Sequence, residues 1–112
     1  MIRPTVGRVV WYRPGKYDDI ARIDGAPLAA IVASVFGDDC VNLTVFDAMG
    51  VAHPRTSVTL VQDGGPPVEA LGDGASYCEW MPYQKGQAAK TEALEARLAA
   101  AEGRAGKTVH GT

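Results

Sequence analysis

The sequence predicts a small, mainly β fold, an SH3-like barrel of five strands followed by a C-terminal α-helix. Over residues 1–83, short apolar segments alternate with turns rich in glycine, proline and aspartate. One long connection comes early, at residues 13–27, and the next two turns are short. Residues 84–112 contain good helix formers and then a glycine-containing tail. The 112 residues therefore fit one barrel domain with an appended helix and flexible tail.

The first two strands are expected at residues 6–12 and 28–36. The first is β-branched and aromatic, as strands prefer. The second is almost entirely apolar, which suits a strand that is buried or strongly curved. A helix is the competing interpretation, but the isoleucine, valine and phenylalanine content and the flanking Pro27 and Gly37 favour a strand. We expect the apolar residues of the intervening loop to fold back onto the domain; they are Tyr17, Ile20 and Ile23.

The remaining three strands are expected at residues 41–46, 51–61 and 76–81. The first of these shows the clearest alternation of apolar and polar residues in the chain. His53 and Pro54 predict an edge or a bulge in the second, because proline cannot donate a ladder hydrogen bond. Closing these short strands into a barrel would leave no sheet edge exposed.

An OB-like barrel is the alternative fold. It normally carries a helix between the third and fourth strands, and residues 49–54 are too short to hold one. The helix is instead expected at residues 87–102, separated from the barrel by Gly86. Residues 103–112 are expected to form a frayed tail.

Composition and the order of apolar residues argue against several classes of protein. The formal net charge of -2 argues against a nucleic-acid binder, which usually has a basic face. No apolar run approaches the ~20 residues that a membrane helix needs. The first residues do not resemble a signal peptide, so we expect a protein made in a cytoplasm. Cys40 and Cys78 lie in strand-like apolar segments and are expected to be buried free thiols.

The sequence contains no recognisable catalytic, metal-binding or nucleotide-binding motif. Residues 106–108 resemble the end of a Walker motif, but the earlier glycine and the following helix are missing. A nucleophilic pair of Cys78 and His53 would lack an orienting group. A cation site would require the acidic pairs at residues 18–19 and 38–39 to meet. We therefore expect no enzymatic activity and no cofactor.

The aromatic residues near strand ends are the main candidates for binding a partner: Trp11, Tyr12, Tyr17, Trp80 and Tyr83. Tryptophan and tyrosine provide a large contact area at low entropic cost, and in SH3-like barrels such positions often form a binding groove. The simpler alternative is that Trp11 and Trp80 belong to the core. Strand alternation places Trp11 and Tyr12 on opposite faces, so at least one of them points away from the other.

The helix offers a second candidate surface. Leu94 and Leu98, with Ala101, form a stripe at helical spacing. Two leucines among many alanines are too few for a stable lone coiled coil. We expect the stripe to dock on a neighbour, either its own barrel or another subunit. The separation by Gly86 favours another subunit.

Four segments resemble a family of short proteins encoded by tailed bacteriophages and prophages. They are TVGRVVWY at residues 5–12, AAIVA at 29–33, VNLTVFD at 41–47 and CEWMP at 78–82. The resemblance covers residues 4–90 and carries over no functional residues. It implies a head decoration, head–tail joining or tail accessory protein, which would act through weak contacts repeated over a symmetric particle.

The expected function is therefore a virion accessory structural protein that binds other phage structural proteins and copies of itself. We expect no small-molecule substrate, no membrane and no nucleic acid among its partners. The alternative is a non-virion adaptor that binds a host protein or nucleic acid. Basic residues of the N-terminal part support that alternative, although nearby aspartates dilute them; the basic residues are Arg3, Arg8, Arg13, Lys16 and Arg22.

Overall fold

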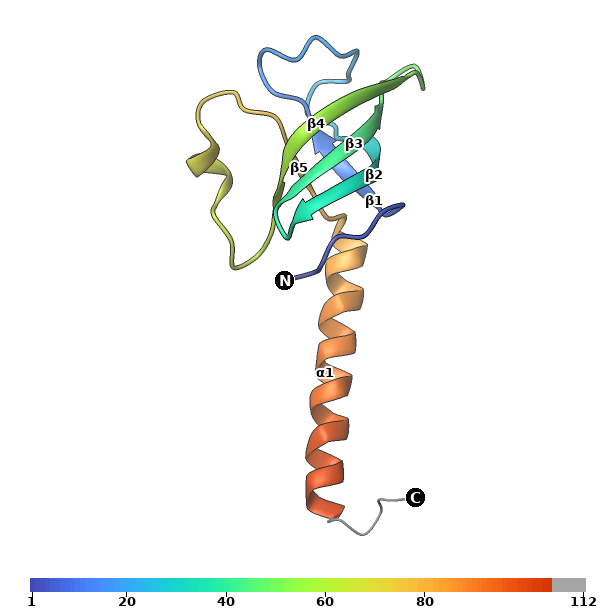
Figure 1. Cartoon of the computed structure of the whole chain (residues 1–112), viewed down its shortest axis with the longest axis vertical. Coiled ribbons are helices and arrows are strands. Elements are labelled where there is room, and N and C mark those ends of the chain that lie inside the picture. Colours follow the sequence, from blue (N-terminus) through green and yellow to red (C-terminus); the bar gives the residue numbers. More distant parts are fainter. Residues whose placement is uncertain (106–112) are drawn as a thin grey trace. The chain divides into compact units, whose positions relative to one another are not determined.

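The structure, a computed structural model, describes residues 1–105, with side chains described as far as residue 102. The chain divides into two compact units, Met1–Met81 and Pro82–Thr112. The first is a closed barrel of five strands, and the second contains one helix (Figure 1). The expected barrel with a C-terminal helix is confirmed. Residues 106–112, including the Walker-like residues and most of the expected tail, lie outside the described residues.

All five expected strands are present. Their bounds are β1 (Val9–Arg13), β2 (Leu28–Gly37), β3 (Cys40–Phe46), β4 (Ala52–Val61) and β5 (Tyr77–Glu79). A short 3-10 helix, η1 (Val68–Leu71), lies in the loop before β5. The first strand begins later than expected because the preceding residues form a turn, in which the Arg8 amide donates to the Thr5 carbonyl and Gly7 has a φ of +92°.

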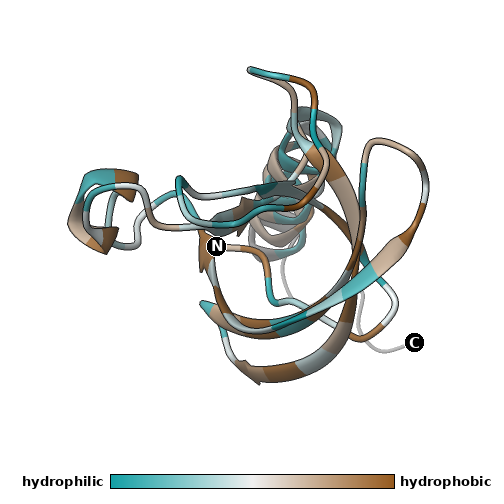
Figure 2. Ribbon diagram, turned by 90° about the horizontal axis from the view of Figure 1, so that it is seen from above, coloured by the Kyte–Doolittle hydropathy of each residue, from teal (hydrophilic) through white to brown (hydrophobic). Residues whose placement is uncertain are grey.

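The strand order is that of an SH3-like barrel. Strands β1 to β4 form an antiparallel meander. Strand β5 pairs antiparallel with β1 and parallel with β4, which closes the barrel (Figure 2). The long loop between β1 and β2 and the 3-10 helix before β5 also fit this fold. The β3–β4 connection at residues 47–51 is a tight turn, so the OB-like alternative is wrong.

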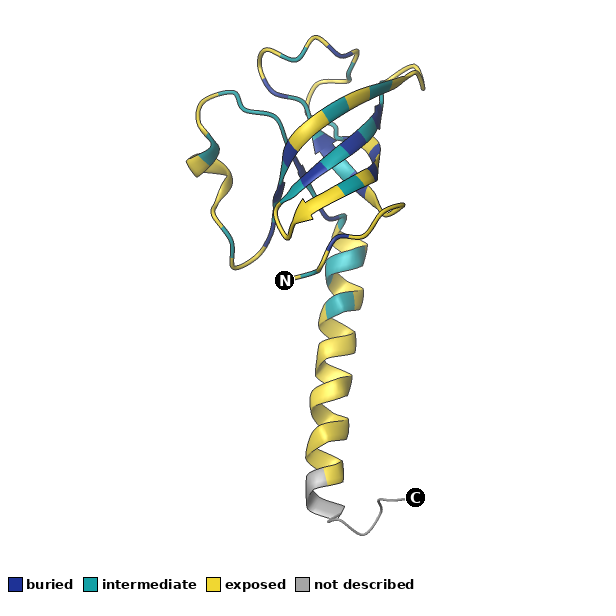
Figure 3. Cartoon of the chain, viewed as in Figure 1, coloured by how far each residue is buried: buried dark blue, intermediate teal, exposed yellow. Residues whose placement is uncertain are grey.

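The hydrophobic core lies inside the barrel, and buried residues alternate with more exposed ones along β1, β2 and β3 (Figure 3). The loop between β1 and β2 contributes Ile20, as expected, whereas Tyr17 and Ile23 remain exposed. Cys78 is buried and Cys40 is half-buried, and both thiols are free as predicted. The core comprises Val10, Tyr12, Ile20, Leu28, Ala30, Val32, Val41, Leu43, Val45, Val58, Leu60, Cys78 and Trp80.

Gln62 is the one buried polar side chain among the described residues. Its Oε1 accepts hydrogen bonds from the Trp80 indole (3.1 Å) and the Ile2 amide (2.8 Å). Its Nε2 donates to the carbonyls of Ile2 (2.8 Å) and Asp38 (2.7 Å). One amide thus joins the N-terminal segment, the β2–β3 turn and the residue that follows β5.

The helix α1 (Pro82–Ala105) begins five residues before the expected position. Proline is favoured in the first turn of a helix, because its missing N–H would have no partner there. Gly86 and Gly103 both lie within the helix, so neither glycine bounds it. The first compact unit ends at Met81, directly before the helix. No helix in the described part of the chain has the length and apolar character needed to span a membrane.

Candidate functional site

An apolar patch lies on the outer surface of the barrel. Residues of β1 alternate, so Tyr12 points into the core and Trp11 points outward. Val9 is paired with Ile31 across the β1–β2 ladder, and Trp11 is paired with Ala29. We call these four residues the outer β1–β2 face. Cross-strand partners share a face of the sheet, so the four side chains form one continuous surface.

The outer β1–β2 face continues across the barrel. Ile31 is paired with Thr44 of β3, and Thr44 is paired with Pro54 of β4. Val9 and Ile31 are 38% and 37% exposed. Antiparallel sheets usually place polar residues on their solvent face. The row across the four strands contains only one polar residue, Thr44, beside Val9, Ile31 and Pro54. An apolar row of this kind is a surface on which another protein could pack.

A fixed ion pair borders the outer β1–β2 face. Arg13 Nε donates to Glu79 Oε2 at 2.7 Å, and Glu79 is paired with Trp11 across the β1–β5 ladder. The Arg13 guanidinium carbon also lies 5.6 Å from the centre of the Trp11 ring. The guanidinium therefore stacks on the indole while its charge is neutralised, which holds Trp11 in place beside the apolar row.

The loop between β1 and β2 displays Tyr17, which is 82% exposed. Lys16 Nζ lies 5.4 Å from the centre of its ring. The loop is anchored next to it by Asp18, whose carboxylate accepts hydrogen bonds from Arg55 Nε (3.0 Å) and Nη2 (2.8 Å), from the Tyr12 hydroxyl (2.5 Å) and from the Ile20 amide (3.1 Å). Tyr17 is thus presented by an anchored segment.

The Asp18 cluster is an electrostatic anchor. The Arg55 guanidinium holds the pKa of Asp18 well below its ordinary value, against the opposing effect of burial. Burial, and then the hydrogen bond to Asp18, raise the pKa of Tyr12. Because Asp18 is neutralised by Arg55, its carboxylate is not offered to a cation. No group of three or more potential ligands gathers anywhere in residues 1–102 in a way that could hold a metal ion.

His53 and Cys78 do not form a nucleophilic pair. His53 Nε2 lies 2.8 Å from Asp47 Oδ2 in the β3–β4 turn, and this hydrogen bond is the main cause of the lowered pKa of Asp47. Cys78 is fully buried in the core, and burial raises the pKa of its thiol to about 12. The thiol is therefore protonated and enclosed, and the histidine has another partner.

A hollow of about 230 Å³ lies in the β1–β2 loop and is lined in part by Arg13, Arg22 and Asp24. Both guanidinium groups already have partners. Arg13 binds Glu79, and Arg22 Nη1 donates to the carbonyls of Pro14 (3.3 Å) and Gly15 (3.1 Å). These hydrogen bonds hold the loop in its conformation, and the charge of Arg13 is balanced by Glu79.

The predicted partner-binding residues fall into two groups, one buried in the core and one accessible at the surface. Tyr12 and Trp80 belong to the core, so their assignment to an exposed rim is wrong: inward alternation buries the first, and the hydrogen bond to Gln62 holds the second inside. Trp11 and Tyr17 are accessible, on β1 and on the loop. The others lie exposed on α1, namely Tyr83, Leu94 and Leu98.

Sequence reasoning missed Ile31 and Glu79, and it named Arg13 only as a basic residue and not as the neighbour of Trp11. Arg13 follows Trp11 by two residues, so strand alternation already places both side chains on one face. Finding Ile31 requires the register between β1 and β2, which periodicity alone does not provide.

Comparisons with known proteins identify no similar protein. No model of a known protein family matches the chain, and neither the curated proteins nor the solved structures contain a match.

Proposed function

We propose that the protein is a bacteriophage virion accessory structural protein, a capsid decoration, head–tail joining or tail component. It acts by protein–protein contacts and performs no reaction. The observation that carries the proposal is the outer β1–β2 face, with Trp11 held beside the paired Val9 and Ile31. Its partner is an apolar surface of another structural protein of the same particle.

The resemblance of the strand sequences to short tailed-phage proteins supports the viral context. The arrangement of polar groups supports a contact role. Acidic and basic side chains that approach one another in the barrel neutralise each other, as in Asp18–Arg55 and Glu79–Arg13, and Asp47 is hydrogen-bonded to His53. Groups paired in this way stabilise a scaffold and leave the apolar face as the feature that needs a partner.

A patch of this size gives a weak contact on its own. Specific interfaces usually bury about 800 Å² on each partner, which is more than four side chains supply. A symmetric particle presents many identical sites, and a second attachment raises the effective concentration of the first. Weak individual contacts are therefore sufficient for a protein of this class.

Mass spectrometry of washed, purified particles tests the proposal. We expect the chain in many copies per particle. Its absence would overturn the virion assignment and leave the adaptor role as the alternative.

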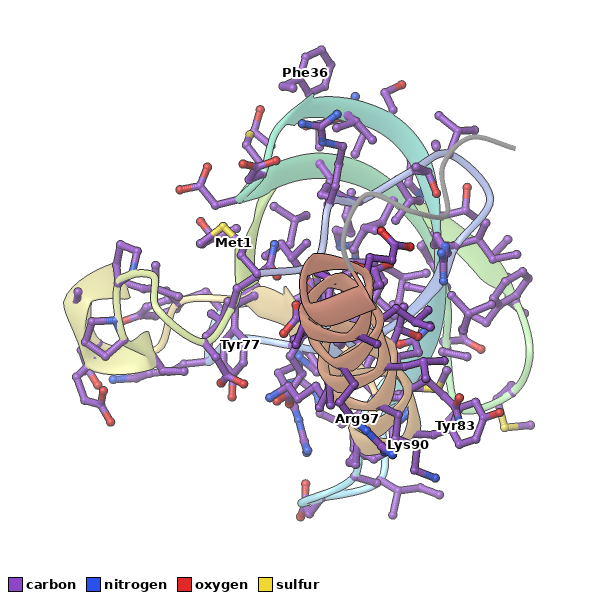
Figure 4. All side chains as sticks on the ribbon, turned by 90° about the horizontal axis from the view of Figure 1, so that it is seen from below. Met1, Phe36, Tyr77, Tyr83, Lys90 and Arg97 are labelled. Atoms are coloured by element: carbon purple, nitrogen blue, oxygen red, sulfur yellow. The ribbon has the colours of Figure 1, made fainter. Side chains whose placement is uncertain are left out.

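A matched pair of substitutions tests the surface. Ile31→Lys places a charge in the outer β1–β2 face and should reduce the copies per particle about tenfold, which corresponds to ~1.4 kcal/mol. Phe36→Lys is the control, because Phe36 lies on the same strand, is 65% exposed and points away from the barrel (Figure 4). Equal incorporation of the two variants would exclude this face as the contact.

The adaptor role keeps one supporting observation, the exposed Lys16–Tyr17 pair at the loop. A cation next to an aromatic ring can bind a nucleic-acid strand. However, most of the basic residues behind this alternative have internal partners, as Arg13 and Arg22 do. A salt-sensitive shift of DNA or RNA by the purified chain, lost in Tyr17→Ala, would support the adaptor role.

A further inference from the structure

The charges of α1 follow a regular pattern beside its leucine stripe. Leu94, Leu98 and Ala101 are spaced by four and then three residues, which places them on one side of the helix. Leu94 and Leu98 are 55% and 53% exposed. This stripe is narrow, and its two large residues have most of their surface available to another helix.

Basic residues border the stripe on one side and acidic residues on the other. Lys90 and Arg97 are seven residues apart and leave the same side of α1 (Figure 4). Glu95 and Glu102 are also seven residues apart and occupy the opposite border. In a heptad with Leu98 at position a and Leu94 at position d, the basic residues fall at g and the acidic residues at e.

The pattern does not serve stability within one helix. Ion pairs along a helix surface require opposite charges three or four residues apart. Between residues 85 and 102, none of the charged residues has an opposite charge at either spacing. The separation of signs to the two borders therefore leaves the attraction to be completed by another helix.

We propose that α1 pairs in parallel with α1 of a second copy of this chain. In a parallel pair, each g residue faces the e residue five positions further along the other helix. Lys90 then faces Glu95 of the second copy, and Arg97 faces Glu102 of the second copy. In an antiparallel pair, g faces g and e faces e, which brings like charges together. The charge pattern selects the parallel orientation.

The pairing is weak in the isolated protein. Two leucines and one alanine line the seam, and the preceding seam positions carry Thr91 and Gln87, which bury little apolar surface. Copies held next to each other on a particle would pair much more fully, because attachment raises their effective concentration. The inference itself rests on the helix alone and goes beyond the proposed function.

Cysteine cross-linking of the full chain tests the orientation. In a parallel pair the two copies of residue 101 meet, so Ala101→Cys should form a disulfide-linked dimer at least tenfold faster than Ala96→Cys, which lies opposite the stripe. The native chain, with its buried and half-buried thiols, gives the background rate. Equal rates for the two variants would overturn the proposal. A mixture of Ala101→Cys and Thr91→Cys chains that forms only the mixed dimer would also overturn it, because positions a and d meet in an antiparallel pair.

Charge exchange tests the recognition. Lys90→Glu with Arg97→Glu makes both borders acidic, and Glu95→Lys with Glu102→Lys makes both borders basic. In the Ala101→Cys background, each variant alone should cross-link at least fivefold more slowly than the parent, and an equal mixture should regain the parent rate as a heterodimer. A mixture no faster than its components would overturn the proposal. Neither result depends on particle incorporation, so the two proposals can fail separately.

Discussion

Gln62 holds together the N-terminal segment, the β2–β3 turn and Trp80. Replacing it with alanine removes the acceptor for the Trp80 indole N–H, which is buried, and the partners of Ile2 and Asp38. A buried donor without a partner costs about 1–3 kcal/mol. We expect Gln62→Ala to lower the free energy of unfolding by about 3 kcal/mol, measured by urea denaturation.

Gln87→Ala is the matched control for this prediction. Gln87 is exposed on α1, so its replacement should change the unfolding of the barrel by less than about 0.5 kcal/mol. If Gln62→Ala also changed the free energy of unfolding by less than about 0.5 kcal/mol, water would be replacing the hydrogen bonds of the amide without loss of stability.

Asp18 predicts a pH dependence of stability. Its pKa is lower in the folded chain than in the unfolded chain, mainly because of Arg55. A lowered carboxyl pKa contributes stability that is complete above the unfolded value of about 4 and is lost as the pH falls below it. Asp18→Asn should therefore destabilise the protein near neutral pH by about 1–3 kcal/mol.

The difference between the native chain and Asp18→Asn should shrink as the pH is lowered from 6 to 2, because the unfolded chain then takes up a proton at Asp18 that the folded carboxyl, with its lowered pKa, binds much less readily. Thermal unfolding at a series of pH values measures it. A difference that stays constant over this range would show that the carboxylate charge contributes nothing to stability.

This residue also marks a limit of sequence reasoning. From the sequence, Asp18 was considered only as one member of the acidic pair at residues 18–19. Its main partner, Arg55, lies 37 positions further along the chain. Strand periodicity gives the face of each residue but not the distant residue that it meets.

At the scale of elements, two loops cross closely at one end of the barrel. The Lys16 amide donates to the Gly74 carbonyl at 2.9 Å, and the Gly15 amide donates to Ser76 Oγ at 2.7 Å. A Cβ on Gly15 would lie 2.2 Å from the Gly74 oxygen and 2.7 Å from the Ser76 nitrogen. Both are backbone atoms that cannot move aside without shifting a loop.

Gly15→Ala should therefore lower the free energy of unfolding by about 2–3 kcal/mol, as overpacking does. Gly65→Ala is the control, because a Cβ there meets nothing closer than 3.4 Å. Chemical denaturation of the two variants measures the difference. Equal stabilities would show that the loops are not held as closely as these contacts indicate.

The strands themselves were predictable to within about three residues, the largest difference being at the start of β1. Alternation at residues 41–46 located β3, and the flanking Pro27 and Gly37 bounded β2. The bulge of β4 was not found. An edge or a bulge was expected near His53 and Pro54, but both residues are regularly paired with β3. The bulge lies near Ser57, which has a φ of +52° and whose amide donates a hydrogen bond to Asn42 Oδ1.

At the scale of the whole molecule, the core is confined to the first unit. Every residue of the hydrophobic cluster lies between Ile2 and Trp80. A chain that ends at residue 81 should therefore keep a cooperative thermal transition, with a midpoint within about 4 °C of the full chain, a shift that corresponds to ~1 kcal/mol at most. A lost or broadened transition would show that the helix is required for folding.

The candidate site was less predictable than the fold. Trp11 and Tyr17 were found because aromatic residues near loops are common in interfaces. The same rule also selected Tyr12 and Trp80, which fill the core. In a barrel this small, large side chains are needed inside as well as outside, so residue type alone does not separate the two roles.

The shared amide of Gln62 has a practical consequence for handling the protein. Because Ile2 and Trp80 bind the same side chain, the first and last residues of the barrel are neighbours. A reporter domain fused ahead of Met1 would therefore lie next to Gln62 and Trp80 of the barrel. An insertion at Met49, exposed in the β3–β4 turn, or a circular permutation opened there, would leave that region clear.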